Sequence, residues 1–175
     1  MMFVSLGIGT AIAVVLIVVV SVLTGGSVNN GSSPPALVGK TLPAIREASL
    51  AGPMITSPWS SGHATAVVFF ASWCGPCRTE LPALSKYLAT HSLGQVTVLG
   101  VDAEDSASSG RSTLAKDHLN IPAFFDPLSK VAAGNFLVGW LPDTVFVTAE
   151  GVVQNMTIGA ISTKQFAAGI AALNA

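Results

Sequence analysis

The chain has 175 residues, of which half are apolar and only 10% are charged, and its mean hydropathy is +0.64. This length suits one domain of ordinary size with an appendage, and the hydropathy indicates that one segment does not fold in water. The net charge is -1, from 8 basic and 9 acidic residues, and no basic run stands out. We therefore expect no nucleic-acid partner.

The first feature in chain order is an uncharged, proline-free apolar run from Phe3 to Leu23. About 20 apolar residues span a bilayer as a helix, whereas the apolar part of a cleaved signal peptide is about 7–15 residues long. We predict a transmembrane anchor over residues 1–24, with a cleaved signal or a buried core helix as the alternatives. Residues 25–35, rich in Gly, Ser and Asn, read as a flexible linker. A lone N-terminal anchor usually exports the domain attached to it, so we expect residues 36–175 outside the cytoplasm as part of a single-pass protein of the cell membrane.

Strand and helix signals alternate through residues 36–175, beginning with a short apolar run that is typical of a strand buried on both faces. Gly151 is expected to take a positive φ in a hairpin turn, and Thr163 is expected to cap the last helix. The pattern predicts an α/β domain with a mixed central sheet and helices on both faces. The predicted strands are Ala66–Ala71, Val96–Val101, Ala123–Phe125, Thr144–Thr148 and Val152–Ile158, and the predicted helices are Cys74–Thr90, Arg111–Leu119, Ser129–Phe136 and Lys164–Leu173.

The two cysteines of the chain, Cys74 and Cys77, share one C-x-x-C motif between a predicted strand and a predicted helix. A disulfide scaffold needs more cysteines, and a structural zinc site usually needs four ligands, so we expect no metal and no cofactor. A helix N-terminus favours the thiolate, which is the nucleophile of thiol–disulfide exchange. We therefore predict that Cys74 attacks a substrate disulfide and that Cys77 resolves the mixed disulfide.

The sequence around this motif resembles a known family. Residues 73–77 read WCGPC, the active-site sequence of the thioredoxin superfamily, and residues 67–84 resemble the membrane-anchored TlpA/ResA-type thioredoxins. The resemblance continues through residues 120–153. It implies a thioredoxin fold, a cis-proline at Pro142 facing the cysteines, and an acidic residue, Glu80, near the buried thiol. This group includes reductases of cytochrome c maturation, so the resemblance implies protein disulfide or dithiol substrates and a transmembrane electron-transfer partner.

Two positions depart from the pattern of the family. Cytoplasmic thioredoxins usually have a buried Asp where this chain has Val68, and Glu80 is a candidate to take over its proton-handling role. Family members commonly have Thr after the cis-proline, whereas this chain has Asp143. The alternative for Glu80 is a solvated first-turn carboxylate that suits the helix dipole. Trp73 is expected to cover the site, with core packing as its alternative.

Some remaining residues are assigned no role in the chemistry. We expect Trp59 and Trp140 to serve as packing or loop anchors. The three histidines, His63, His91 and His118, are expected at the surface. An acidic cluster, Asp102, Glu104 and Asp105, is expected in a solvated loop, with a cation site as its alternative.

We predict a disulfide reductase, because the Gly-Pro dipeptide between the cysteines is the one found in reducing thioredoxins. The first alternative is an oxidant that introduces disulfides into exported proteins. A thiol peroxidase, the second, normally has Thr or Ser and Pro where this chain has Ala71 and Val67. The third is a copper-delivery protein of the C-x-x-x-C type, whose cysteine spacing is longer by one residue.

Overall fold

The computed structural model describes residues 35–175. The predicted anchor (residues 1–24) and all but the last residue of the predicted linker (residues 25–35) lie outside the described residues. Within residues 35–175, no helix is both long enough and apolar enough to cross a membrane.

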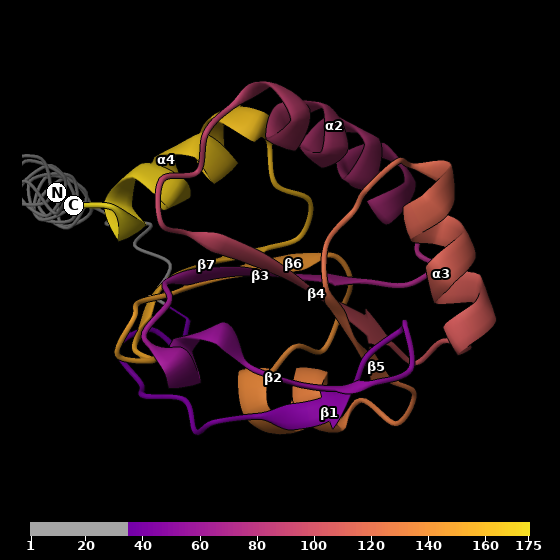
Figure 1. Cartoon of the computed structure of the whole chain (residues 1–175), viewed down its shortest axis with the longest axis horizontal. Helices are drawn as coiled ribbons and strands as arrows, with labels where there is room; N and C mark the ends of the chain where they lie inside the picture. The colour runs from indigo at the N-terminus through magenta and orange to yellow at the C-terminus, as the bar shows by residue number, and fades with distance from the viewer. Residues whose placement is uncertain (1–34) are drawn as a thin grey trace, which may run out of the picture. The chain divides into compact units, whose positions relative to one another are not determined.

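A five-stranded mixed sheet forms the centre of the domain, in the order β5-β4-β3-β6-β7 (Figure 1). β3 lies in the middle, parallel to β4 and antiparallel to β6, and β7 pairs antiparallel with β6. The predicted mixed sheet is therefore present. Its strands are β3 (Thr65–Phe70), β4 (Thr97–Ala103), β5 (Ala123–Asp126), β6 (Asp143–Val147) and β7 (Val153–Ile158).

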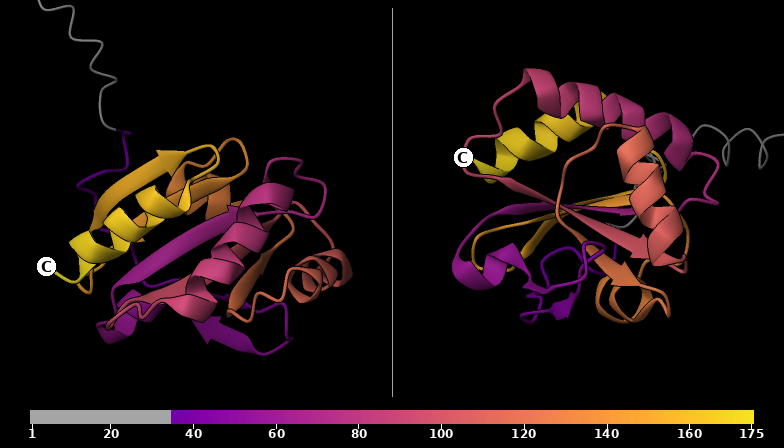
Figure 2. Two further views of the ribbon diagram at one scale, coloured as in Figure 1. Left: turned by 90° about the horizontal axis from the view of Figure 1, so that it is seen from above. Right: turned by 45° about the vertical axis from the view of Figure 1, so that its right-hand side comes forward.

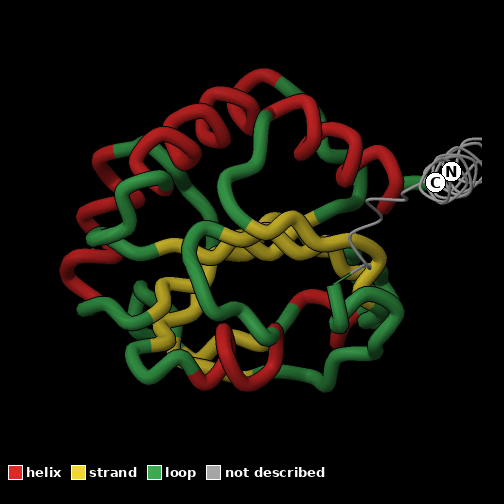
Figure 3. The backbone as a smooth tube through the Cα atoms, turned by 180° about the vertical axis from the view of Figure 1, so that it is seen from behind, coloured by secondary structure: helices red, strands yellow, loops and turns green. Residues whose placement is uncertain are grey.

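Both faces of the sheet are covered, and all six residues of β3 are buried. One face packs on the three long helices α2 (Cys77–Thr90), α3 (Ala107–Lys116) and α4 (Thr163–Leu173). Figure 2 shows α2 and α4 crossing the sheet beside one another, and Figure 3 shows the sheet between this helical layer and a second layer. The second layer contains two short helices, so helices lie on both faces as predicted.

The helix boundaries follow their caps. Ser106 accepts a hydrogen bond from the Ser109 N–H, which places the start of α3 before the predicted Arg111. Ser162 caps α4 and forms a capping box with Gln165, so the expectation that Thr163 is the cap was wrong by one residue. α2 begins at Cys77, because Pro76 is its N-cap, and not at Cys74 as predicted.

The second layer holds the elements that the sequence did not predict. They are the short hairpin of β1 (Arg46–Ala48) with β2 (Met54–Thr56) and the 3-10 helix η1 (Pro58–Ser61). The predicted helix at Ser129–Phe136 is present as a π-helix, η2 (Lys130–Asn135). Gly151, in the turn between β6 and β7, has φ +82° as predicted.

Candidate active site

Cys74 and Cys77 form a disulfide in the loop that joins β3 to α2, with their Cα atoms 5.3 Å apart. Both side chains are buried, at 3% and 1% exposure. The Cys77 N–H, the first of α2, points at Cys74 and lies 3.2 Å from its Sγ. Although α2 starts later than predicted, its N-terminal dipole therefore still faces the Cys74 sulfur, the position that favours a thiolate.

The peptide bond between Leu141 and Pro142 is cis, the geometry that the family resemblance implied. Pro142 directly precedes β6, where Asp143 pairs with Phe69 of β3. This antiparallel register brings Pro142 beside the end of β3, from which the loop to Cys74 departs. The sheet itself therefore brings Pro142 close to the cysteine loop.

Trp73 is 55% exposed, which contradicts the alternative that it packs in the core. Its indole Nε1–H donates to the Glu104 carbonyl oxygen at 2.9 Å, which ties it to the loop after β4. Trp140 is 84% exposed, so it does not pack in the core either. Trp73 and Trp140 line a cavity of about 220 Å³ together with Leu141, directly before the cis bond. A recess with two exposed indoles thus lies at Trp73, the residue before Cys74, and at Leu141, the residue before Pro142.

Glu80 is only 5% exposed, so the alternative of a solvated carboxylate was wrong. Its Oε2 accepts a hydrogen bond from the Ile161 N–H at 2.9 Å, and Oε1 is buried with no partner among residues 35–175. Burial is the largest cause that raises the pKa of Glu80; the Ile161 hydrogen bond lowers it and the negative charge of Asp143 raises it, and together they bring the pKa to about 7. A carboxyl group with such a pKa can accept and release a proton near neutral pH.

Asp143 is also buried, at 3% exposure. Its Oδ1 accepts a hydrogen bond from the Gly159 N–H at 2.8 Å, and burial raises its pKa. The same short segment, residues 159–161, therefore donates one backbone N–H to Asp143 and another to Glu80. The sequence indicated a carboxylate beside the site at Asp143, and the structure adds that this carboxylate is inside the protein.

The acidic cluster is only partly a solvated loop, and the prediction was wrong for Asp102. This residue belongs to β4 and is 0% exposed, whereas Glu104 is exposed. Burial and, to a smaller extent, the charge of Asp105 together raise the pKa of Asp102 to about 7. The apolar Ala103 that follows Asp102 was the signal that the strand continues through the acidic residue.

The other polar candidates lie apart from the disulfide. His63, His91 and His118 are exposed, as predicted. No group of three or more His, Cys, Asp or Glu side chains within residues 35–175 is placed to hold a metal ion.

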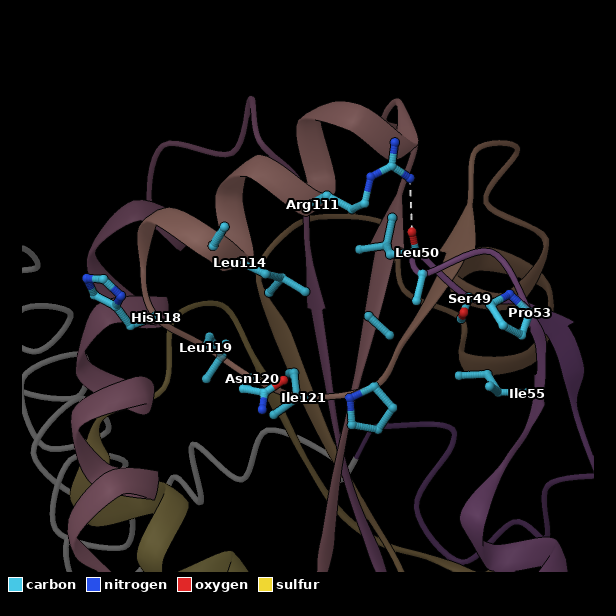
Figure 4. Close-up of a pocket in the computed structure, with 14 residues that line it drawn as sticks. Ser49, Leu50, Pro53, Ile55, Arg111, Leu114, His118, Leu119, Asn120 and Ile121 are labelled. Carbon is cyan, nitrogen blue, oxygen red and sulfur yellow. Dashed lines mark hydrogen bonds between the residues drawn. The ribbon is translucent and has the colours of Figure 1, made fainter.

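A larger cavity, of about 630 Å³, lies between the β1–β2 turn, α3 and the loop before β5. Figure 4 shows Arg111 crossing one end of it, where its Nη1 donates to the Leu50 carbonyl oxygen at 2.9 Å. None of the five predicted site residues lines this cavity. We therefore place the exchange chemistry at the disulfide and not in this larger space.

Comparison with known proteins shows the family. Residues 38–156 match the AhpC/TSA family. The chain belongs to this family. It is 24% identical over 128 residues to the thiol-disulfide oxidoreductase ResA of Bacillus cereus, which is 73% of each chain. It is 27% identical over 142 residues to the thiol:disulfide interchange protein DsbE homolog of Paracoccus denitrificans, or 76% of this chain and 73% of that one.

Solved structures agree on the thioredoxin fold. A secreted disulfide oxidoreductase of Mycobacterium tuberculosis, described as homologous to E. coli DsbE, superposes with a TM-score of 0.64 at 25% identity, covering 74% of this chain and 96% of that one. A thiol:disulfide interchange protein DsbE from Chlorobium tepidum, described as putative, superposes with a TM-score of 0.68 at 21% identity, covering 79% and 98%. The predicted TlpA/ResA-type kinship is confirmed, and the chain is a thiol-disulfide oxidoreductase.

Proposed function

We propose that the protein is a disulfide reductase that acts outside the cytoplasm on protein disulfides, with apocytochrome c as a substrate. The observation that carries the direction is the burial of two carboxyl groups, Glu80 on α2 and Asp143 at the start of β6. Glu80 lies one helical turn after Cys77, and Asp143 follows the cis-proline. Negative charge near a thiol disfavours its thiolate. A less stable reduced form makes the dithiol the better electron donor, which favours reduction of the substrate.

The proposed reaction has two steps. The Cys74 thiolate attacks one sulfur of the substrate disulfide, and the other substrate sulfur leaves and takes up a proton. Glu80 then accepts the proton of the Cys77 thiol, and the Cys77 thiolate attacks the Cys74 sulfur. The second substrate sulfur leaves and takes up the proton from Glu80, so the substrate departs as a dithiol that has gained two electrons, and the Cys74–Cys77 disulfide remains.

Two residues shape this reaction without exchanging electrons. Pro142, beside the end of β3, faces the disulfide and receives the substrate chain, and Trp73 covers the site from the β4–α3 side. The proposed reaction uses no metal and no cofactor.

Another round requires two electrons from a partner. Because we propose that residues 1–24 anchor the chain in the cell membrane and that the domain lies outside, the partner is a transmembrane protein that passes electrons across the bilayer. The full chain should then resist carbonate extraction from membranes, and a tag after Ala175 should be digested by external protease in spheroplasts. A shortened, soluble product would indicate a cleaved signal instead.

The reduction potential of the Cys74–Cys77 pair tests the direction of the reaction. Equilibration with thiol–disulfide buffers should give a value near that of thioredoxin, about -270 mV, because the buried carboxyl groups disfavour the thiolate. A value near that of the strong periplasmic oxidant, about -120 mV, would make the protein an oxidant of exported proteins.

A further inference from the structure

Asp102 occupies a buried position on β4, on the sheet face that packs against the long helices. It pairs in register with Phe70 of β3 and Phe125 of β5, and it is 0% exposed. α3 closes over it at Gly110, where a Cβ atom would collide with the Asp102 carboxyl group. Arg111, the next residue, holds α3 to the Leu50 carbonyl oxygen (Figure 4). The Asp102 carboxyl group therefore lies in a tight, apolar space, and α3 closes one side of it.

Neither oxygen of Asp102 has a hydrogen-bond donor among residues 35–175. After burial, the charge and the side-chain hydrogen bond of Asp105 raise the pKa of Asp102, so this second carboxyl group is its polar neighbour. Two neighbouring carboxylates repel, and an unpaired buried charge is costly. The contact is favourable when one proton lies between them, since a protonated carboxyl group is a donor.

Asp105 in turn binds the segment that leads to the cysteines. Its Oδ2 accepts from the Ser72 N–H at 2.6 Å, and its Oδ1 accepts from the Ser106 N–H. The neighbouring Glu104 carbonyl oxygen accepts from the Trp73 indole. The loop after β4 thus binds two consecutive residues directly before Cys74.

We propose that Asp102 is a positioning residue for the exchange reaction: its proton is donated to Asp105, which holds Ser72 and so fixes the approach to Cys74. Loss of that proton leaves two facing carboxylates, and Asp105, at the outer end, moves away and releases Ser72. The proton of the pair thereby sets the reactivity of Cys74. The proposal rests on the exchange activity and not on its direction.

The surroundings of Asp102 bring the loss of its proton close to neutral pH. Burial first, and the charge of Asp105 second, raise the pKa of Asp102 to about 7. β3 and β5 present Phe70 and Phe125 beside it, and α3 presents Gly110. Asp105 is therefore the charged group that acts on Asp102 within residues 35–175.

The first experiment follows the Ser72 amide by NMR in the labelled, oxidised full chain, kept in mild detergent, between pH 5 and 9. We expect its chemical shift to titrate with a midpoint of about 7. Asp102→Asn keeps the shape and carries a permanent donor, so the titration should disappear. The matched control is Asp126→Asn on β5, whose carboxylate accepts from the Val131 and Ala132 N–H groups instead; it should keep the titration.

The second experiment measures alkylation of Cys74 by iodoacetamide in the Cys77→Ser background, where it is the one remaining thiol. From pH 6 to 8, the rate ratio of Asp102→Asn to its parent should change by roughly tenfold, the effect of one charge-assisted hydrogen bond. The ratio for Asp126→Asn should stay constant. Repeating the series with Glu80→Gln distinguishes the titration of Glu80 from that of Asp102. The Glu80→Gln change should leave the pH titration of the Ser72 amide in place.

Two results would overturn the proposal: a Ser72 amide that does not move near pH 7 in the parent, or a titration that survives in Asp102→Asn. Should Asp102→Asn not fold, Asp105→Asn gives a second test. An Asn at 105 can still accept from Ser72 while donating to the Asp102 carboxylate, so the Ser72 midpoint should move to lower pH. An unchanged midpoint in that variant would also contradict the pair.

Discussion

Glu80 on α2 and Asp143 on β6 bring two buried carboxyl groups to one short segment, which donates the Ile161 N–H to the first and the Gly159 N–H to the second. The charge of Asp143 raises the pKa of Glu80, in addition to the larger effect of burial. Neither carboxyl group is solvated. Burial and the like charge of Asp143 therefore act together to keep the pKa of the proton acceptor, Glu80, close to neutral.

Replacing Glu80 with Gln should slow resolution of the mixed disulfide by roughly 10²-fold, the low end of general-base effects, because the variant keeps the hydrogen bond to Ile161 but cannot accept the Cys77 proton. The initial attack by Cys74 should change little. Stopped-flow reduction of a model disulfide across pH resolves both steps. Glu104→Gln, at an exposed side chain of the same charge, is the control. Equal resolution rates in the variant and the parent would remove Glu80 from the mechanism.

Asp143 should control the pH at which Glu80 works. Asp143→Thr removes the negative charge that raises the pKa of Glu80. The Glu80 pKa should then fall, so the pH midpoint of the resolution step should move to lower pH, by an amount smaller than the burial effect that remains. Stopped-flow measurements of resolution in Asp143→Thr, from pH 5 to 9, test this. A midpoint that moves upward would show that Asp143 acts as a hydrogen-bond partner and not as a charge.

Stability should decrease as the pH rises toward neutrality. Glu80 and Asp102 have ordinary values of 4.5 and 3.8 and folded-state pKa values of about 7. Between these limits the folded state binds protons that the unfolded state has released, so the free energy of unfolding falls with pH, by at most about 1.4 kcal/mol per unit for each group. The stabilising contribution of these two protonated groups is fully present below about pH 4 and is lost as the pH passes 7.

Urea unfolding of the oxidised full chain at pH 4 to 8.5 measures this slope. Glu80→Gln and Asp102→Asn should each make the curve flatter, and their effects should be close to additive if the two groups are independent. As a control, Leu128→Ala removes an exposed, uncharged side chain and should leave the slope unchanged. A free energy of unfolding that rises from pH 4 to 8 would contradict burial of these groups in their neutral form.

Local patterns in the sequence predicted the central sheet and the cysteine loop, because β3 is a continuous apolar run and the motif follows it. The β1–β2 hairpin escaped notice, since its three-residue strands are too short to show a period of two. Asp102 was misread because adjacent acidic residues are typical of a loop, and its burial depends on α3 closing over it at Gly110. The partners of Glu80 and Asp143 come from a distant segment, which no local pattern indicates.

The exposed indoles should select substrates. Trp73 and Trp140 line the cavity of about 220 Å³ beside the cis-proline, and exposed tryptophans next to an apolar recess are typical of binding hot spots. A substrate that approaches Cys74 can place an apolar side chain in this cavity. Trp140→Ala should therefore lower kcat/KM by about tenfold or more for a peptide disulfide with aromatic neighbours, relative to kcat/KM for a small aromatic disulfide.

The comparison needs a second exposed apolar residue as its control. Leu128→Ala removes a side chain that is 73% exposed and lies outside this cavity, so both kcat/KM values should stay as in the parent. Peptides with Ser in place of the aromatic neighbours supply the matched substrate, and Trp140→Ala should erase the parent's preference between the two peptides. A preference that survives in Trp140→Ala would contradict a role of Trp140 in substrate selection. An equal loss of kcat/KM for both classes of disulfide would also contradict it, because that result would indicate a disturbed Leu141–Pro142 bond and not a lost contact with substrate.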